Sequence, residues 1–174
     1  MGMDVVGIKP ESERGEYFRN NVWWWRPLLN YCSFVASEIV TDEVVEGCSY
    51  NDGNGLDAEG AIKLANILQD EIDSGRTQEH QDEYNKWRSE LPREHCNICD
   101  GTGIRTDDLG VEHGWPTKEL NPEVQILTGR THGSCNSCHG VGTTEAWLAH
   151  YPFSVENVQE FALFLKESGG FQVW

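Results

Sequence analysis

The sequence predicts an α+β fold that is mainly helical and carries an inserted zinc-binding hairpin. Apolar residues recur at helical spacing in several segments, short apolar runs lie near both ends of the chain, and a cysteine motif occurs twice in its middle. With 174 residues, 38% of them hydrophobic, the chain is long enough for one well-packed domain with an insertion. We expect residues 1–95 and 143–174 to form the body and residues 96–142 to form the insertion.

The first forty residues predict one strand and one helix. Residues 3–8 are a short strand candidate, whereas residues 10–16 are polar and predict a loop. Pro27 suits the first turn of a helix, because its missing N–H would have no partner there. We therefore expect a helix over residues 27–40, on which apolar side chains share one face. These are Leu28, Tyr31, Cys32, Val35 and Ile39.

Two further helices are expected before the first cysteine motif. Residues 51–55 form a turn cluster, and Asp57 is a favourable N-cap for the helix that follows. An apolar stripe continues from Ala61 until Gly75, a residue typical of a helix C-terminus. Residues 79–91 then predict a charged helix, which ends before a proline.

The C-terminal segment is again mainly helical. Residues 144–150 predict a short helix, and Ser154 predicts the N-cap of a longer one. Gly169 and Gly170 end that helix. Residues 171–174 then predict a closing strand beside the N-terminal strand.

A duplicated cysteine motif lies in the middle of the chain. Residues 96–103 and 135–142 both read CxxCxGxG. Two such turns supply four thiolates, which is the number that a closed tetrahedral zinc site needs. The glycines suit the positive φ of these sharp turns. The sequence therefore predicts one bound Zn²⁺, with four protein ligands: Cys96, Cys99, Cys135 and Cys138.

Disulfides, buried free thiols and a catalytic zinc are the alternatives. Disulfides need an oxidising compartment, whereas the first residues do not form a signal peptide and no stretch approaches 18 apolar residues. We therefore expect a cytoplasmic location and no membrane association. A catalytic zinc keeps one coordination position open for water or substrate. Four cysteine ligands would leave no such position. Three histidines flank the motifs and are expected outside the ligand set: His95, His132 and His139.

The segment between the motifs must leave one and return to the other. It consists of the 35 residues that lie between Cys99 and Cys135. Residues 107–110 predict a turn within it, and residues 123–127 predict a short strand. A bound metal would offset the entropy that closing this loop costs.

The two repeats resemble the cysteine-rich zinc domain of DnaJ-type proteins, which normally carries four repeats and two zinc ions. With two repeats, the resemblance implies one ion. The chain has no His-Pro-Asp motif, so the resemblance does not extend to co-chaperone activity. The whole chain more loosely resembles small bacteriophage and prophage proteins, through residues 16–27, residues 51–56 and the Leu-Pro-Arg at residues 91–93. That likeness implies a phage-encoded accessory protein, acting in the host cytoplasm.

The chain is strongly acidic. It has 29 acidic and 13 basic residues, and a formal net charge of −16. Such a surface repels phosphate backbones, so nucleic acid is an unlikely partner. It favours a host or phage protein with a basic surface, and suggests inhibition of a host nucleic-acid-handling or defence complex by charge mimicry. The alternative is that the acidity serves only solubility.

No motif identifies a catalytic or cofactor-binding set. The chain lacks a P-loop, a dinucleotide-binding glycine motif, GxSxG and HExxH. We therefore favour a non-enzymatic interaction protein and assign no catalytic residues. An enzyme with an unfamiliar active site and a zinc-knuckle nucleic-acid binder remain alternatives.

Three consecutive tryptophans and two remaining cysteines complete the candidate residues. In a strand, Trp24 would face away from Trp23 and Trp25, so this run predicts either a core cluster or a binding surface. Cys32 is expected to pack as a small hydrophobe. Cys48 lies in a loop-like segment, and no spacing suggests a second metal site.

Overall fold

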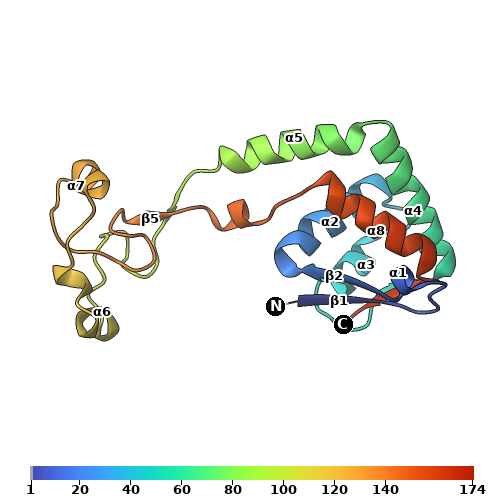
Figure 1. The fold of residues 1–174 in the computed structure, drawn as a ribbon, viewed down its shortest axis with the longest axis horizontal. Helices are drawn as coiled ribbons and strands as arrows, with labels where there is room; N and C mark the ends of the chain where they lie inside the picture. Colours follow the sequence, from blue (N-terminus) through green and yellow to red (C-terminus); the bar gives the residue numbers. More distant parts are fainter. Residues whose placement is uncertain (1) are drawn as a thin grey trace. The chain divides into compact units, whose positions relative to one another are not determined.

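The computed structural model describes residues 2–174 and divides the chain into two compact units. The first unit combines Met1–Ser89 with His150–Trp174, and the second is Glu90–Ala149. Figure 1 shows the elements of each unit. Among the described residues, no helix is both long and apolar enough to cross a membrane.

A four-stranded antiparallel sheet supports the first unit, with strand order β2-β1-β6-β3. Its strands are β1 (Gly2–Gly7), β2 (Tyr17–Asn21), β3 (Gly55–Leu56) and β6 (Phe171–Val173). The predicted pairing of the N-terminal and C-terminal strands is confirmed, since Val5 lies opposite Val173. Alternate residues of β1 and β6 are buried, so one face of the sheet packs on the helices.

Six helices complete the first unit: α1 (Glu13–Glu16), α2 (Val22–Val35), α3 (Asp42–Gly47), α4 (Ala58–Asp73), α5 (Arg76–Ser89) and α8 (Val155–Glu167). Helices α4 and α8 lie side by side (Figure 1). Leu68 of α4 and Leu165 of α8 are fully buried, and burying each such side chain stabilises the fold by about 1.5–3 kcal/mol. The predicted N-caps are confirmed, because Asp57 and Ser154 accept hydrogen bonds from backbone N–H groups.

The start of the first long helix was predicted wrongly. Helix α2 begins at Val22 and not at Pro27, because the Asn21 side chain accepts hydrogen bonds from the N–H groups of Trp23 and Trp24. The helix ends at Val35 and not at residue 40. The three tryptophans are therefore helical. The alternation expected for a strand does not apply to them.

Other local predictions for the first unit need smaller corrections. Residues 10–16 were expected to be a loop, but α1 begins at Glu13. Strand β2 and helix α3 had no predicted counterpart. Helix α5 spans Arg76–Ser89 and not residues 79–91.

The second unit contains a two-stranded sheet and two short α-helices. Strands β4 (Glu94–His95) and β5 (Thr143–Thr144) pair antiparallel. The helices are α6 (Asp108–Glu112) and α7 (Pro122–Thr128), with a 3-10 turn, η1 (Trp115–Thr117), between them. A second 3-10 turn, η2 (Trp147–His150), follows β5, so the helix expected over residues 144–150 is only partly present.

The strand predicted over residues 123–127 is wrong, because this segment is helix α7. Its boundaries are standard helix signals. The Asn121 side chain accepts a hydrogen bond from the Val124 N–H, Pro122 occupies the first turn, and Gly129 ends the helix in the left-handed conformation. The apolar run that suggested a strand leaves Ile126 and Leu127 exposed to solvent.

Candidate metal centre

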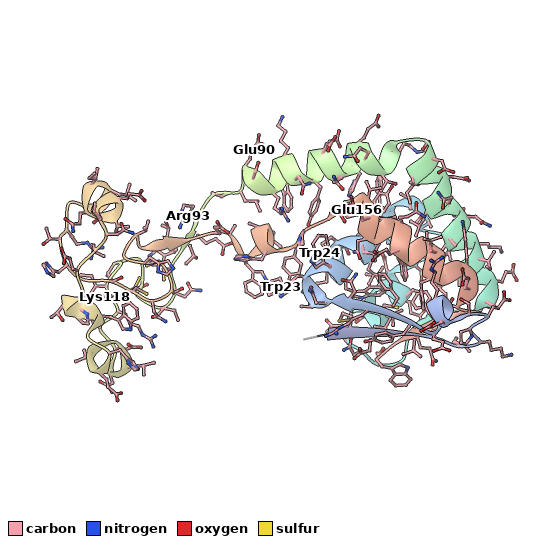
Figure 2. All side chains as sticks on the ribbon, in the orientation of Figure 1. Trp23, Trp24, Glu90, Arg93, Lys118 and Glu156 are labelled. Carbon is pink, nitrogen blue, oxygen red and sulfur yellow. The ribbon has the colours of Figure 1, made fainter. Side chains whose placement is uncertain are left out.

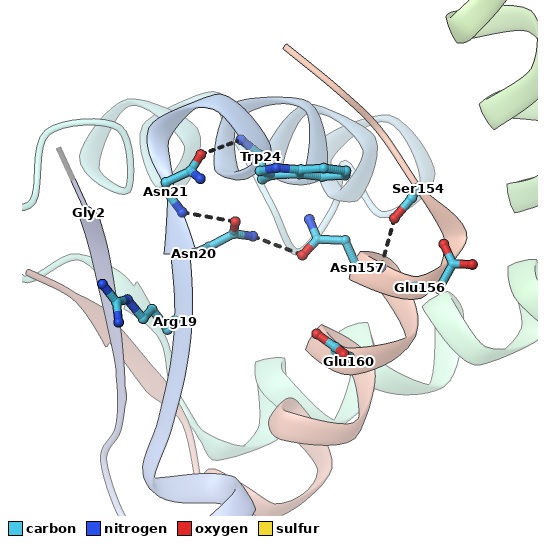
Figure 3. A pocket seen from close by; sticks show the side chains of 9 residues that line it. All are labelled: Gly2, Arg19, Asn20, Asn21, Trp24, Ser154, Glu156, Asn157 and Glu160. Carbon is cyan, nitrogen blue, oxygen red and sulfur yellow. Dashed lines mark hydrogen bonds between the residues drawn. The ribbon is translucent and has the colours of Figure 1, made fainter. Parts of the chain in front are cut away.

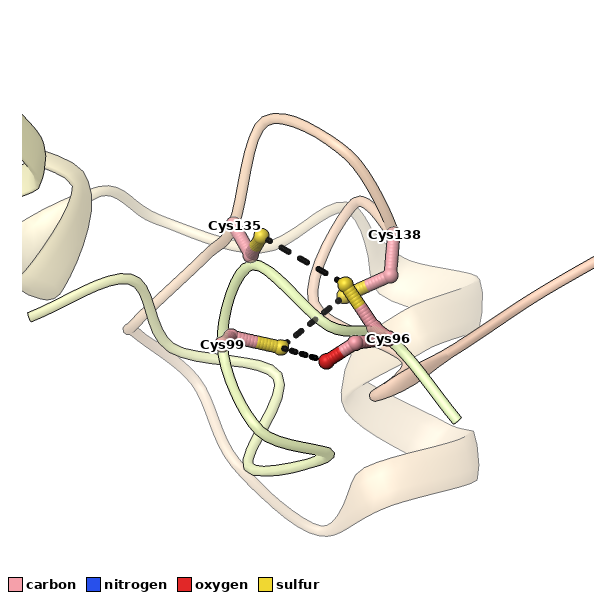
Figure 4. A group of neighbouring side chains, drawn as sticks. All are labelled: Cys96, Cys99, Cys135 and Cys138. Carbon is pink, nitrogen blue, oxygen red and sulfur yellow. Dashed lines mark hydrogen bonds between the residues drawn. The ribbon is translucent and has the colours of Figure 1, made fainter. Parts of the chain in front are cut away.

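The structure brings the four cysteines of the duplicated motif together. Their sulfur atoms all lie within 4.8 Å of one another. The Cys96 and Cys135 sulfurs are 4.0 Å apart, and those of Cys99 and Cys138 are 3.6 Å apart (Figure 4). Four sulfurs bound tetrahedrally at about 2.3 Å from a zinc ion would lie about 3.8 Å apart. The cluster therefore has the size of a tetrahedral metal site, and its sulfurs are too far apart for disulfides.

The two cysteine turns have matching backbone hydrogen bonds. The Gly103 N–H donates to the Cys99 sulfur at 3.3 Å, and the Gly142 N–H donates to the Cys138 sulfur at 3.2 Å. These donors are the last glycines of the two repeats. An N–H group directed at a sulfur favours the thiolate, which is the form that binds metal.

The same glycines let the two turns pack against each other. A Cβ atom on Gly103 would lie 2.3 Å from the Gly140 carbonyl oxygen, and one on Gly142 would lie 2.3 Å from the Gly101 carbonyl oxygen. Both residues also have positive φ, 75° and 87°. No other residue would fit without moving backbone. The glycine spacing of the motif is therefore explained by this reciprocal contact between the repeats.

The pKa values of the cysteine thiols explain why the cluster suits a cation. Burial raises the pKa of Cys96, but hydrogen bonds from the backbone N–H groups of Cys99 and Ile98 outweigh it and bring that pKa to about 6. Burial, together with the Cys96 and Cys138 sulfurs, raises the pKa of Cys99 to about 12. Four thiolates this close repel one another unless a positive charge lies between them. The residues can hold a metal ion, and zinc is the common ion for four cysteine ligands.

The three histidines near the motifs lie outside the cluster. His95, His132 and His139 are all exposed. The His95 Nδ1 lies 3.9 Å from an Asp100 carboxylate oxygen, and the His132 Nδ1 lies 3.0 Å from the Thr131 hydroxyl. Within residues 2–174, the group that could hold a metal ion consists of the four cysteines alone.

Arginines hold the loops around the cluster, a role that the sequence analysis missed. The Arg130 guanidinium donates hydrogen bonds to the carbonyl oxygens of Gly133, just before the second motif, and Gly140, within it. The Arg105 guanidinium pairs with Asp107 at 2.8 Å and also donates to the Asn136 side chain at 2.9 Å. Their position beside the cysteine motifs was the only signal of this role in the sequence.

The two other cysteines belong to the core of the first unit. Cys32 and Cys48 are both fully buried. Burial raises the pKa of Cys48 to about 12 and raises that of Cys32 further, so both stay protonated near neutral pH. They pack as small apolar groups, as expected for Cys32.

The three consecutive tryptophans differ in their burial. Trp25 is completely buried, and its indole N–H donates to the Cys48 carbonyl oxygen at 2.9 Å. Trp23 and Trp24 are half-buried at the start of α2 (Figure 2). Trp23 packs against Tyr151, with ring centroids 4.9 Å apart. The expectation of a core cluster is therefore confirmed for Trp25.

Comparisons with protein-family models, with curated proteins and with solved structures found no match. The class of the protein therefore follows from its own structure, an α+β fold with a cluster of four cysteines that can bind a metal ion.

Proposed function

We propose that this chain is a zinc-stabilised, non-enzymatic interaction protein that binds a basic partner protein. One observation carries the zinc-stabilised part. In the 60-residue second unit, the buried apolar residues other than the four cysteines are Leu120, Val124 and Ala146. A unit of this size with so small a hydrophobic core needs an additional source of stability, such as a bound metal ion. Zinc held by the four cysteines provides it and organises residues 96–142.

The ligand set favours a structural role for the ion. Four sulfurs complete a tetrahedral shell and leave no position for water or substrate. The sulfurs belong to buried residues, and the neighbouring histidines are not among the ligands. Zinc in such a site would contribute folding free energy to the second unit.

The charge of the surface supports a basic partner. Ion pairs within residues 2–174 engage five of the carboxylates: Glu59, Glu71, Asp100, Asp107 and Glu167. The chain has 29 acidic residues, so most remain available to a partner. Unpaired surface carboxylates steer association with positively charged surfaces and repel nucleic acid.

The finer identity follows from the phage-like resemblance of the sequence. In this proposal the protein is phage-encoded and acts in the host cytoplasm. It occupies the basic groove of a host nucleic-acid-handling or defence complex. The acidic surface there takes the place of the phosphate backbone.

Metal analysis and partner capture together test the proposal. Purified protein should contain about one zinc per chain. Capture from nuclease-treated host lysate should give a stoichiometric protein partner, and the purified pair should associate more slowly as salt rises. A matched variant with surface carboxylates replaced by amides should associate more slowly at low salt. A folded protein without metal would refute the zinc assignment. Tight, salt-sensitive binding to duplex DNA in place of a protein would refute the partner assignment.

A further inference from the structure

A pocket of ≈ 690 Å³ lies in the first unit, between β2, the start of α2 and the first turns of α8 (Figure 3). A fixed pair of amides lies within it. The Asn20 side-chain N–H donates to the Asn157 side-chain oxygen at 3.0 Å, and the Asn20 oxygen accepts from the Asn21 backbone N–H at 3.0 Å. Asn20 is only 7% exposed. These bonds hold the polar groups of the pocket in place before any ligand binds.

An indole ring forms one wall of the pocket. Trp24 is half-buried, and the N-cap bond from its backbone N–H to the Asn21 side chain fixes the turn that carries it. Figure 3 shows the ring edge-on, with one face turned towards Asn157. A flat aromatic face beside polar groups is a typical platform for a cation or another planar group.

Negative charge outweighs positive charge around the pocket. Glu156 and Glu160 project from α8 four residues apart, so they share one face of the helix and repel each other. Within residues 2–174, neither forms an ion pair. Among the described residues that line the pocket, Arg19, on its opposite side, is the one that carries a positive charge.

We propose that this pocket binds an arginine side chain of the basic partner, with its guanidinium stacked on Trp24 and paired with the carboxylates of Glu156 and Glu160. A guanidinium is planar, so one face can lie on the indole while its edge donates hydrogen bonds to carboxylate or amide oxygens. A lysine ammonium cannot make both contacts in this way. The inference rests on the proposed function and names the contact that the basic partner makes.

Binding can be measured residue by residue with a small probe. The probe is N-acetyl-arginine methylamide, titrated into the ¹⁵N-labelled, zinc-loaded full chain. We expect saturating shifts of the Trp24 indole N–H and the Asn157 side-chain amide, with a dissociation constant in the millimolar range. The lysine and glutamate analogues should cause much smaller shifts at these groups.

Variants of the pocket test the contacts separately. Glu156→Gln with Glu160→Gln should weaken binding of the probe about fivefold or more. The matched control, Glu79→Gln with Glu83→Gln, removes the same charge at the same spacing on α5 and should change it less than about twofold. Trp24→Ala should weaken binding about three- to tenfold, and Trp24→Phe should partly restore it. Arg19→Gln should strengthen binding slightly, because it removes a repelling charge.

Several outcomes would overturn the inference. Equal weakening by the α5 control would show that general surface charge attracts the probe. Stronger binding of the glutamate analogue, or weaker arginine binding in Arg19→Gln, would show an anion site. Equal binding of the lysine analogue would exclude a guanidinium-specific site. If the captured partner associates with Trp24→Ala as well as with the unchanged protein, the pocket is not its binding site. The proposed acidic interaction surface would then still stand.

Discussion

The reciprocal glycine contact between the two cysteine turns gives a quantitative prediction for zinc affinity. In Gly103→Ala, the new methyl group would lie 2.3 Å from the Gly140 carbonyl oxygen, at a φ of 75°. A left-handed alanine costs about 1–2 kcal/mol. Relieving the overlap requires backbone to move, which costs about 1–3 kcal/mol more. The combined effect is therefore about 2–5 kcal/mol.

If zinc stabilises the second unit as proposed, metal binding and folding of that unit are one equilibrium, and this cost should appear as lost zinc affinity. At about 1.4 kcal/mol for each factor of ten, the affinity should fall about 30- to 4000-fold. Competition against a chromophoric zinc chelator at fixed pH would measure it. Gly142→Ala should lose a similar amount, since its Cβ would meet the Gly101 carbonyl oxygen at the same distance.

The second unit offers a matched control for this prediction. Gly129 also has a positive φ, 69°, but a Cβ atom there would have no neighbour within 4 Å. Gly129→Ala should therefore carry only the conformational cost of about 1–2 kcal/mol, and its zinc affinity should fall by about 5- to 30-fold. Equal losses in Gly103→Ala and Gly129→Ala would show that backbone conformation alone explains the glycines, and that the contact between the repeats does not matter.

Three further predictions concern the ligands, the core and pH. Cys96→Ser should abolish zinc binding and remove the dispersed amide resonances of residues 90–149, whereas Cys32→Ala should leave the zinc content of the protein unchanged by metal analysis. Leu68→Ala should lower the free energy of unfolding of the first unit by about 2–5 kcal/mol in urea, with no change in zinc content. Burial lowers the pKa of His80, whose ring lies 4.8 Å from those of Tyr31 and Phe153. The folded state therefore binds this proton less readily than the unfolded state, and stability should fall as pH drops below about 6.5. In His80→Gln, the free energy of unfolding measured in urea should fall less between pH 7.5 and 5.5 than in the unchanged protein. An unchanged pH dependence would contradict this reasoning.

The cysteine cluster could be predicted because its chemistry is local in the sequence. Each CxxC turn places two sulfurs together by itself, and only the meeting of the two turns depends on the fold. Helices α4 and α8 were predictable for the same reason, since their caps, Asp57 and Ser154, act within one helical turn. The short apolar runs near the two ends of the chain also identified β1 and β6, although the pairing of these strands joins opposite ends of the chain.

The errors have two causes: one element depends on a longer-range strand pairing, and in two others local helix signals were given less weight than apolar composition. Residues 17–21 have two adjacent apolar residues and no clear alternation, so β2 forms because it pairs with β1 and buries Phe18. The facing of the three tryptophans was considered for a strand, but the Asn21 cap places them in the first turn of α2. In α7, the apolar run suggested a strand, whereas Asn121, Pro122 and Gly129 were stronger signals for a helix.

The two units differ in what stabilises them, and this difference follows from where their apolar residues lie. The first unit has a continuous core, in which Trp25, Phe161 and Leu64 are at most 1% exposed. The second unit leaves most of its large apolar side chains in solvent, including Ile126 at 86% and Leu127 at 68%. Hydrophobic burial can therefore stabilise the first unit, but it contributes little to the second. The cysteine cluster is the buried centre of the second unit, so a metal ion bound there would contribute folding free energy to that unit.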